Sequence, residues 1–290
     1  MADRPTAQHA RLSGERLHLN EGPIDLVIGA KGDPAAIQAA YAAAAERFDG
    51  LLSGLVAELP QLRQPTEPGD LTLTGPVARR MVRAVRPHSA IFVTPMAAVA
   101  GAVADEILAA MSAIPGLDKA YVNNGGDIAL HLVRGEQMKI GAVSEVDTGL
   151  PDGFAAIHAD TGIRGVATSG VDGRSFSLGI ADAVTVLAEN AAAADVAATL
   201  IANAVDIDHP AVRREPAFDL DPDSDLGDRL VTVSVGNLPA SSVAHALDRG
   251  TACAETMSRR GLIRGALLRC QRQTRAISDS SLLENHRSRN

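Results

Sequence analysis

The stretch KAYVNNGGDIALHLVRGEQMKIGAV, residues 119–143, indicates the kind of sheet that this chain forms. Its runs of apolar and β-branched residues predict strands near 119–123, 127–133 and 137–143. Arg134-Gly135 separates the last two strands and predicts a hairpin between them. A hairpin places antiparallel pairing in the sheet, so we expect a mixed sheet.

Outward from this stretch, helices and strands alternate irregularly. On the N-terminal side we predict a strand at 23–30, a helix from the cap Asp33-Pro34 to Gly50, a short basic helix at 76–87, a strand at 90–93 and a helix at 97–112. On the C-terminal side we predict strands near 154–158, 163–168, 183–188, 229–236 and 262–270, and helices at 191–203 (capped by Asn190) and 239–258. The Asp- and Pro-rich segment 206–228 is expected to be a surface loop or a short disordered excursion. This order predicts a layered mixed-sheet α/β (α+β) fold, with a single domain over residues 1–278 and a disordered tail at 279–290.

Composition limits the classes of partner. The 290 residues carry 27 Lys+Arg against 35 Asp+Glu, a formal net charge of −8, which argues against nucleic acid as a partner. Aromatic residues make up 2% of the chain and none is Trp, so no row of rings is available for stacking bases. The N-terminus has no apolar signal segment, and we expect no stretch near the roughly 18 apolar residues that a membrane span needs. We therefore expect a cytoplasmic protein with no membrane partner.

Two segments that follow predicted strands carry groups suited to anions. In Asn123-Asn124-Gly125-Gly126-Asp127, the paired glycines let backbone N–H groups approach an anion without a Cβ in the way. In Gly165-Val166-Ala167-Thr168-Ser169-Gly170, a strand ends in two hydroxyls and a glycine that can hydrogen-bond phosphate or ribose oxygens. An ordinary turn also explains either segment taken alone.

A third segment, Ala194-Asp195-Val196-Ala197-Ala198-Thr199, carries a carboxylate and a hydroxyl four residues apart. On a helix both side chains lie on the same face, one turn apart. Oxygen ligands of this kind suit Mg²⁺, which keeps other positions for water or substrate phosphate. The alternative is that Asp195 sits in the first turn of its helix, where the macrodipole favours a negative charge.

The chain lacks the sequence motifs of several other enzyme classes. The eight histidines include no His-Glu-x-x-His, and neither a Gly-x-Ser-x-Gly elbow nor a Walker lysine loop is present. Cys253 and Cys270 lack metal-ligand spacing and are interpreted as small buried side chains. The arginines of residues 79–86 fit a solvated helix face better than a phosphate clamp.

Taken in order, these segments resemble the ApbE-like superfamily, whose best-known members are FAD:protein FMN transferases. The family's Gly-rich helix start, with an Asp four residues after its glycine, is matched by residues 97–101 and Asp105. Its Gly-Gly-Asp and Ala-Thr-Ser-Gly segments are matched by residues 125–127 and 167–170. Its Val-Thr-Val strand and the following Ala-Asp helix are matched by residues 184–186 and 194–199. The resemblance covers roughly residues 90–205 and implies an ApbE-like, T-fold-resembling architecture.

The resemblance also implies roles for the matched residues. Asp195, Thr199 and the backbone carbonyl of Ala97 would hold Mg²⁺ against the pyrophosphate of FAD or a related dinucleotide. Asp127 or Asp182 would orient the nucleophile, and nothing in the sequence chooses between them. The metal would assist cleavage of FAD, or transfer of FMN to water or to a threonine of a protein acceptor. The nucleotide would be positioned by Thr94, Met96, Gly125, Gly126, Thr168, Ser169 and Gly170.

The chain also departs from the family pattern. Ala100 stands where the family has a lysine, and only Val171 to Ala183 fill the place of its His-x-x-Asp-Pro-x-Thr-Gly segment. Three interpretations therefore stay open. The first is an enzyme of the kind just described, and the second is a non-catalytic module that binds a flavin or another small anion. The third is a structural protein, such as a homodimer with a vestigial pocket.

Overall fold

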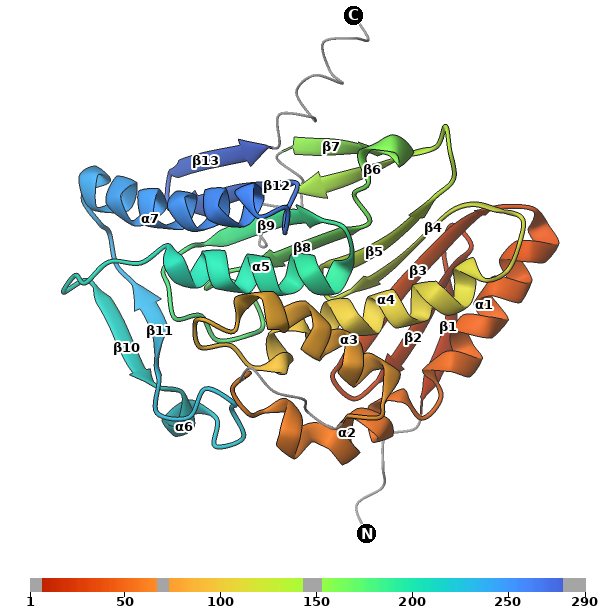
Figure 1. Ribbon diagram of the computed structural model, residues 1–290, viewed down its shortest axis with the longest axis horizontal. Coiled ribbons are helices and arrows are strands. Elements are labelled where there is room, and N and C mark those ends of the chain that lie inside the picture. Colours follow the sequence, from red (N-terminus) through yellow and green to blue (C-terminus); the bar gives the residue numbers. More distant parts are fainter. Residues whose placement is uncertain (1–6, 67–72, 143–152, 279–290) are drawn as a thin grey trace, which may run out of the picture. The chain divides into compact units, whose positions relative to one another are not determined.

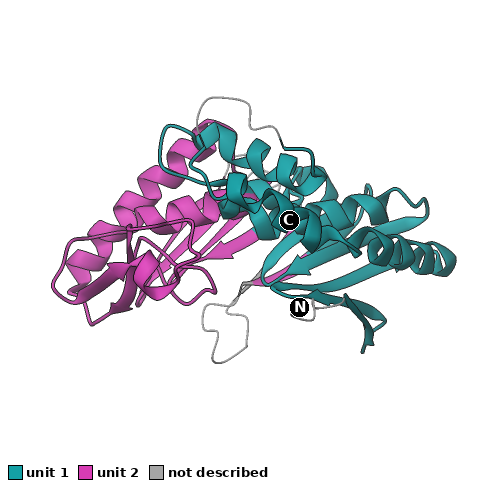
Figure 2. Cartoon of the chain, turned by 90° about the horizontal axis from the view of Figure 1, so that it is seen from below, with its two compact units in different colours: residues 1–138, 158–166, 190–193 teal, residues 139–157, 167–189, 194–290 magenta. Residues whose placement is uncertain are grey.

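The computed structural model describes residues 7–66, 73–142 and 153–278 (Figure 1). The chain clusters into two compact units, drawn in separate colours in Figure 2. Unit 1 consists of residues 1–138, 158–166 and 190–193, and unit 2 of residues 139–157, 167–189 and 194–290. The single domain expected over residues 1–278 stays a prediction, and the tail expected at 279–290 lies outside the described residues.

Unit 1 contains an antiparallel sheet with the strand order β1-β2-β3-β4-β5-β8. Alternate residues of β3 and β4 are buried, which is the pattern expected of strands with one face on a core. Strand β8 begins in unit 1 and ends in unit 2. The strand bounds are β1 (Gln8–Leu12), β2 (Arg16–Glu21), β3 (Ile24–Gly32), β4 (Leu117–Asn124), β5 (Asp127–Leu132) and β8 (Gly165–Ser169).

Helices cover the sheet of unit 1, with α4 packed on β4 and β5 and α1 packed on α4 and β3. Helix α1 begins where the sequence predicts, because Asp33 accepts a hydrogen bond from the Ala35 N–H at 2.8 Å and Pro34 is the first helical residue. Phe48, Met81, Ile107 and Met111 are fully buried between these layers. The helices are α1 (Pro34–Phe48), α2 (Leu51–Leu62), α3 (Pro76–Val85) and α4 (Val99–Ser112), with 3-10 turns η1 (Arg86–His88), η2 (Pro95–Ala98) and η3 (Ala159–Thr161).

Residues Pro95–Ser112, which form η2 and α4, are long and apolar enough to cross a membrane by length and composition, with a mean hydropathy of 1.3. The expectation that the chain holds no such stretch was therefore wrong. Half of this stretch is buried inside the protein. Its carboxylates also have protein partners: Asp105 binds backbone N–H groups and Glu106 binds two arginines. The place of α4 in the core of unit 1 accounts for its apolar character.

Unit 2 holds a second set of paired strands, in the order β8-β9-β12-β13, on which α7 packs (Figure 1). Strand β12 pairs antiparallel with both β9 and β13. Helix α5 begins in unit 1 and continues in unit 2. The elements are β9 (Ala183–Ala188), α5 (Ala191–Ala204), β10 (Val212–Pro216), α6 (Ala217–Leu220), β11 (Leu230–Val235), α7 (Ala240–Arg259), β12 (Gly265–Cys270) and β13 (Gln273–Ser278).

The mixed α/β fold class is confirmed, but three local predictions were wrong. The hairpin at Arg134-Gly135 does not form, because β5 pairs with β4 and β8 while β6 (Gln137–Ala142) pairs with β7 (Gly153–His158). Residues 90–93 are not a strand: Val93 is buried and accepts a single backbone hydrogen bond from Thr66, without a ladder. The segment 206–228 is not only a loop, because it carries β10 and α6.

Candidate functional site

The turn η2 carries three of the predicted site residues in unit 1. Thr94 caps this turn: its hydroxyl oxygen accepts a hydrogen bond from the Met96 N–H at 3.2 Å, and the residue is 2% exposed. Pro95 follows at the first position, where its fixed φ suits a helical start. Met96 and Ala97 come next and are half-buried. Thr94 is therefore a capping residue, and Met96 and Ala97 lie just before the start of α4.

The Gly125-Gly126 turn between β4 and β5 is tied to the same end of α4. Both glycines have positive φ, 64° and 115°, which other residues adopt only at a cost. Asn123 accepts a hydrogen bond from the Gly126 N–H at 2.8 Å, and the buried Asn124 amide donates to the Ala100 carbonyl at 3.1 Å. Asp127 opens β5 opposite Asn124. Unit 1 thus brings the Gly-Gly-Asp segment beside the start of α4, close in sequence to Ala97.

Gly101 and Asp105 join α4 to the first turn of α5. A Cβ on Gly101 would lie 2.3 Å from the Ala191 carbonyl oxygen, so only glycine allows this approach. One turn later, the Asp105 carboxylate accepts hydrogen bonds from the N–H groups of Ala191 and Ala192 at 3.0 and 2.9 Å. Burial raises the pKa of Asp105, and the two amide hydrogen bonds oppose that rise. The Gly101–Asp105 spacing therefore has a structural explanation.

In unit 2, the Thr168-Ser169-Gly170 segment ends strand β8 directly against Asp182. The hydroxyls of Thr168 and Thr185 lie 2.9 Å apart across the two neighbouring strands. A Cβ on Gly170 would lie 2.2 Å from the Asp182 carbonyl oxygen. Thr168 is exposed, Ser169 is half-buried and Gly170 is buried. Unit 2 therefore brings together two groups of predicted site residues that are separated by about a dozen positions.

The Asp182 carboxyl occupies a mixed electrostatic environment. Burial is the main cause that raises its pKa, and repulsion from Asp172 raises it further. A hydrogen bond from the Gln271 backbone and the charge of Arg269, whose Nε lies 3.9 Å from Asp182 Oδ2, oppose the rise. A carboxyl with a raised pKa is a stronger base than an ordinary aspartate.

Asp195 and Thr199 lie one turn apart on α5, and both are half-buried. The first turn of α5 contains no acidic residue, and its N–H groups are bound by Asp105 and by Asn190, which accepts from the Ala193 N–H at 2.8 Å. The alternative role of Asp195, as the charge that stabilises the helix start, is thus filled by Asp105. Within the described residues, no three His, Cys, Asp or Glu side chains gather as a metal site. The candidate metal ligands on α5 are the Asp195 carboxylate and the Thr199 hydroxyl. Both are oxygen ligands, which Mg²⁺ prefers.

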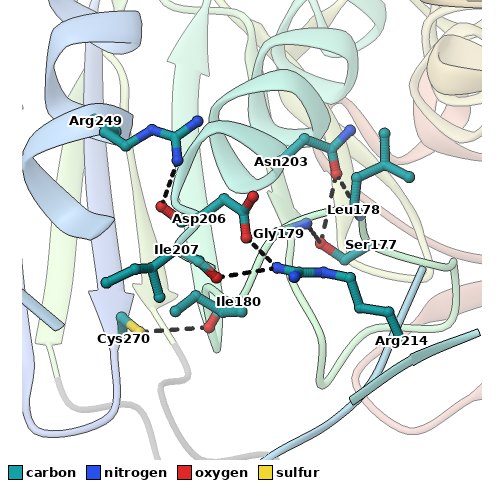
Figure 3. Close-up of polar contacts among 10 residues, drawn as sticks. All are labelled: Ser177, Leu178, Gly179, Ile180, Asn203, Asp206, Ile207, Arg214, Arg249 and Cys270. Atoms are coloured by element: carbon teal, nitrogen blue, oxygen red, sulfur yellow. Dashed lines mark hydrogen bonds and ion pairs between the residues drawn. The ribbon is translucent and has the colours of Figure 1, made fainter. Parts of the chain in front are cut away.

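The segment that leads into Asp182 is held by side chains that the sequence did not reveal (Figure 3). Asn203 of α5 accepts a hydrogen bond from the Leu178 N–H at 2.9 Å, and the hydroxyl of Ser177 accepts from the Gly179 N–H at 3.2 Å. The Cys270 thiol donates to the Ile180 carbonyl at 3.4 Å. Residues 177–180 are thus fixed from α5 on one side and from β12 on the other.

A second group of contacts in Figure 3 fixes the chain after α5. The Arg214 guanidinium pairs with the Asp206 carboxylate and donates to the Ile207 carbonyl at 3.4 Å. Arg249 of α7 donates to the Asp206 carbonyl at 2.8 Å. An Asp-rich segment with several arginines gives no sign of which pairs form, so this anchor could not be predicted.

The predicted residues therefore form one group in each unit. Thr94, Met96, Ala97, Gly125, Gly126 and Asp127 belong to unit 1, and Thr168, Ser169, Gly170, Asp182, Asp195 and Thr199 belong to unit 2. Their convergence on one cleft, and the proximity of Ala97 to Asp195, stay predictions. The contributions of Asp172 and Gln271 were missed, because neither belongs to a motif.

Comparison with known proteins gives matches along most of the chain. The family model described as AbpE bacteria matches residues 8–276. A UPF0280 protein of Methanosarcina acetivorans is 35% identical over 195 residues, which are 67% of this chain and 73% of that protein. A UPF0280 protein of Methanopyrus kandleri is 41% identical over 160 residues, 54% of this chain and 61% of that protein. The chain thus spans about six tenths of the length of the latter relative.

Two solved structures are similar at low identity. The crystal structure of an ApbE protein from Thermotoga maritima is 11% identical, covering 96% of this chain and 99% of that chain, with a TM-score of 0.49. The flavin transferase ApbE from Vibrio cholerae is 14% identical, with the same coverage and a TM-score of 0.43.

Proposed function

Because this chain belongs to the family described as AbpE bacteria, we propose that it binds a flavin nucleotide and cleaves FAD, or transfers its FMN part, with the help of Mg²⁺. Family membership confirms the resemblance drawn from the sequence motifs. All four motif segments lie inside the matched residues 8–276. The UPF0280 relatives share part of the chain, and the activity of the whole protein is the proposal.

One observation carries the proposal further than family membership alone. The Ala-Thr-Ser-Gly segment ends against Asp182, with so little space that Gly170 cannot be replaced without moving the Asp182 backbone. The segment that carries two hydroxyls able to bind nucleotide oxygens therefore ends against the backbone of Asp182, whose carboxyl has a raised pKa. This is the combination that positioning a phosphate ester and accepting a proton from an incoming hydroxyl requires.

The chain's residues divide these tasks. Thr168 and Ser169 can donate hydrogen bonds to phosphate or ribose oxygens, because a hydroxyl is both donor and acceptor. The N–H groups of the Gly125-Gly126 turn can donate to an anion without a Cβ in the way. Asp182 accepts the proton of the attacking water or acceptor hydroxyl, and its raised pKa makes it a stronger base than an ordinary aspartate. Asp127 remains the alternative base.

The metal site in this proposal consists of Asp195, Thr199 and the Ala97 carbonyl. A bound Mg²⁺ would neutralise the charge that develops on the leaving phosphate. Asp195 and Thr199 fit this role because both supply oxygen ligands and lie one turn apart on α5.

The test is to incubate the purified protein with FAD and Mg²⁺ and to separate the products by chromatography. Release of AMP, with FMN free or attached to the protein, supports the enzyme. Asp182→Asn should reduce the rate while leaving FAD binding intact, and Asp219→Asn on exposed α6 is the matched control.

The second interpretation, a non-catalytic binder, is favoured by Ala100, which stands in place of the family's lysine and has its carbonyl occupied by Asn124. Bound FAD that is recovered intact in the presence of Mg²⁺ would establish it. Absence of both binding and turnover would contradict the proposed function in either form.

A further inference from the structure

The turn between β12 and β13 contains a strained residue. Gln271 has a φ of +50°, in the left-handed region that residues with a Cβ adopt only at a cost. It lies in the two-residue connection between Cys270 and Gln273, where glycine or asparagine is usual. Strain of this kind persists only where the surrounding contacts hold it, and it is often found beside functional groups.

Three contacts hold Gln271 in this conformation. Its side-chain amide donates to the Gly236 carbonyl at 2.9 Å, and its side-chain oxygen accepts from the Leu238 N–H at 3.4 Å. Its own carbonyl accepts from Arg269 Nε at 3.5 Å. The side chain is thus hydrogen-bonded to residues 236 and 238, just before α7, and these bonds fix the backbone of the turn.

The consequence of this backbone conformation lies at Asp182. The Asp182 N–H donates a hydrogen bond to the Arg269 carbonyl at 3.0 Å, and Arg269 Nε, which donates to the Gln271 carbonyl, lies 3.9 Å from Asp182 Oδ2. We propose that Gln271 is a positioning residue for Asp182: its left-handed backbone, locked by the side-chain amide, holds its own carbonyl on Arg269 Nε and so keeps that guanidinium beside the Asp182 carboxylate. The proposal deepens the proposed function and rests on it only for the catalytic use of Asp182.

Several charged or titratable groups act on the Asp182 carboxylate. Arg269 of β12 attracts its negative charge, and Asp172, in the segment after β8, repels it. The Cys270 thiol is the third group: burial and the charge of Asp182 raise its pKa to about 12, so it stays neutral. Among these groups, Arg269 is the one that the Gln271 carbonyl holds in place, and truncating the Gln271 side chain can release it.

The test is a carbon-13 NMR titration of the Asp182 carboxyl in the nucleotide-free protein, with the resonance assigned by its loss in Asp182→Asn. In Gln271→Ala the side-chain contacts are lost while the backbone strain remains, so the turn relaxes and its carbonyl no longer holds Arg269. With that positive charge less well placed, the pKa of Asp182 should rise by about half a unit or more. In Gln271→Gly the left-handed region is accessible without strain, so the rise should be smaller.

Gln273→Ala is the matched control. Gln273 lies two residues further on, and its amide also donates to a backbone carbonyl, that of Ala240 at 2.8 Å. This variant should leave the pKa of Asp182 unchanged. The proposal is overturned if Gln271→Ala leaves the pKa of Asp182 unchanged, or if Gln273→Ala shifts it as much. Because no nucleotide is present, this result is independent of whether FAD is bound or cleaved.

Discussion

The carboxylate of Asp105 on α4 accepts a hydrogen bond from the backbone N–H of Ala191, at 3.0 Å, across 86 positions of sequence. The same carboxylate binds Ala192, so a side chain from one helix caps the start of another. This contact joins two of the motifs that mark the family resemblance, the Gly101–Asp105 pair and the helix that carries Asp195.

Asp105→Ala should lower the free energy of unfolding by about 1–2 kcal/mol, because two N–H groups at the start of α5 lose their acceptor. Denaturant unfolding followed by circular dichroism measures this loss. Asn190→Ala removes a single bond, to the Ala193 N–H, from an exposed position and should cost less. Equal costs for the two variants would contradict the capping role of Asp105.

Gly101→Ala should destabilise the protein by about 1–3 kcal/mol, because the new Cβ would overlap the backbone of Ala191 and both helices would have to shift. Gly54→Ala is the matched control within α2, where an added Cβ meets nothing within 4 Å. That change should stabilise the protein by about 0.4–1 kcal/mol. If Gly101→Ala left the free energy of unfolding unchanged, that result would contradict the close approach of α4 to the first turn of α5.

The lowered pKa of Glu106 predicts that the free energy of unfolding depends on pH. Burial raises its pKa, but hydrogen bonds and charge from Arg80 and Arg47, at 2.6 and 2.9 Å, outweigh burial and hold the pKa below its ordinary value. A lowered pKa in the folded state means that Glu106 stabilises the fold above the ordinary value of 4.5, and that this contribution is lost as the pH falls through the folded pKa.

Glu106→Gln should therefore cost about 1–3 kcal/mol at neutral pH, and the gap to the unaltered protein should narrow below about pH 4.5. Unfolding curves at a series of pH values measure the gap. Glu46→Gln removes the same charge from the exposed side of α1 and should show no such narrowing. A gap that stays constant down to pH 3 would count against the ion pairs.

Local signals predicted the elements that depend on local contacts. Asp33-Pro34 marked the start of α1, and Asn190 marked the start of α5, because caps are made within three residues of the helix start. The hairpin at Arg134-Gly135 failed for the opposite reason. Whether β5 pairs with β6 or with β8 depends on distant parts of the chain, and the local turn residues carry no information on it.

The residue types of the candidate site could be predicted from the sequence, but most of the neighbouring residues that hold them in place could not. Gly101 and Asp105 stood out by their spacing. The sequence does not show why residue 101 must be glycine, because the reason is the contact with the Ala191 backbone, which forms only when α4 packs on the first turn of α5. Asp182 was singled out beside the family motifs, whereas Asp172 and Gln271 were not. A positive φ at a glutamine cannot be read from sequence, because that residue type rarely adopts it.

The proposed Mg²⁺-dependent flavin site is tested most directly by the dissociation constant for FAD, measured with and without Mg²⁺. We expect Mg²⁺ to tighten FAD binding by about tenfold or more, equivalent to about 1.4 kcal/mol. Asp195→Ala should abolish that Mg²⁺ effect while the circular dichroism spectrum stays unchanged, and Asp219→Ala, an equal change of charge on exposed α6, should preserve it. The proposed metal site would be contradicted if Mg²⁺ left the FAD affinity of the unaltered protein unchanged, or if Asp195→Ala kept the full Mg²⁺ effect.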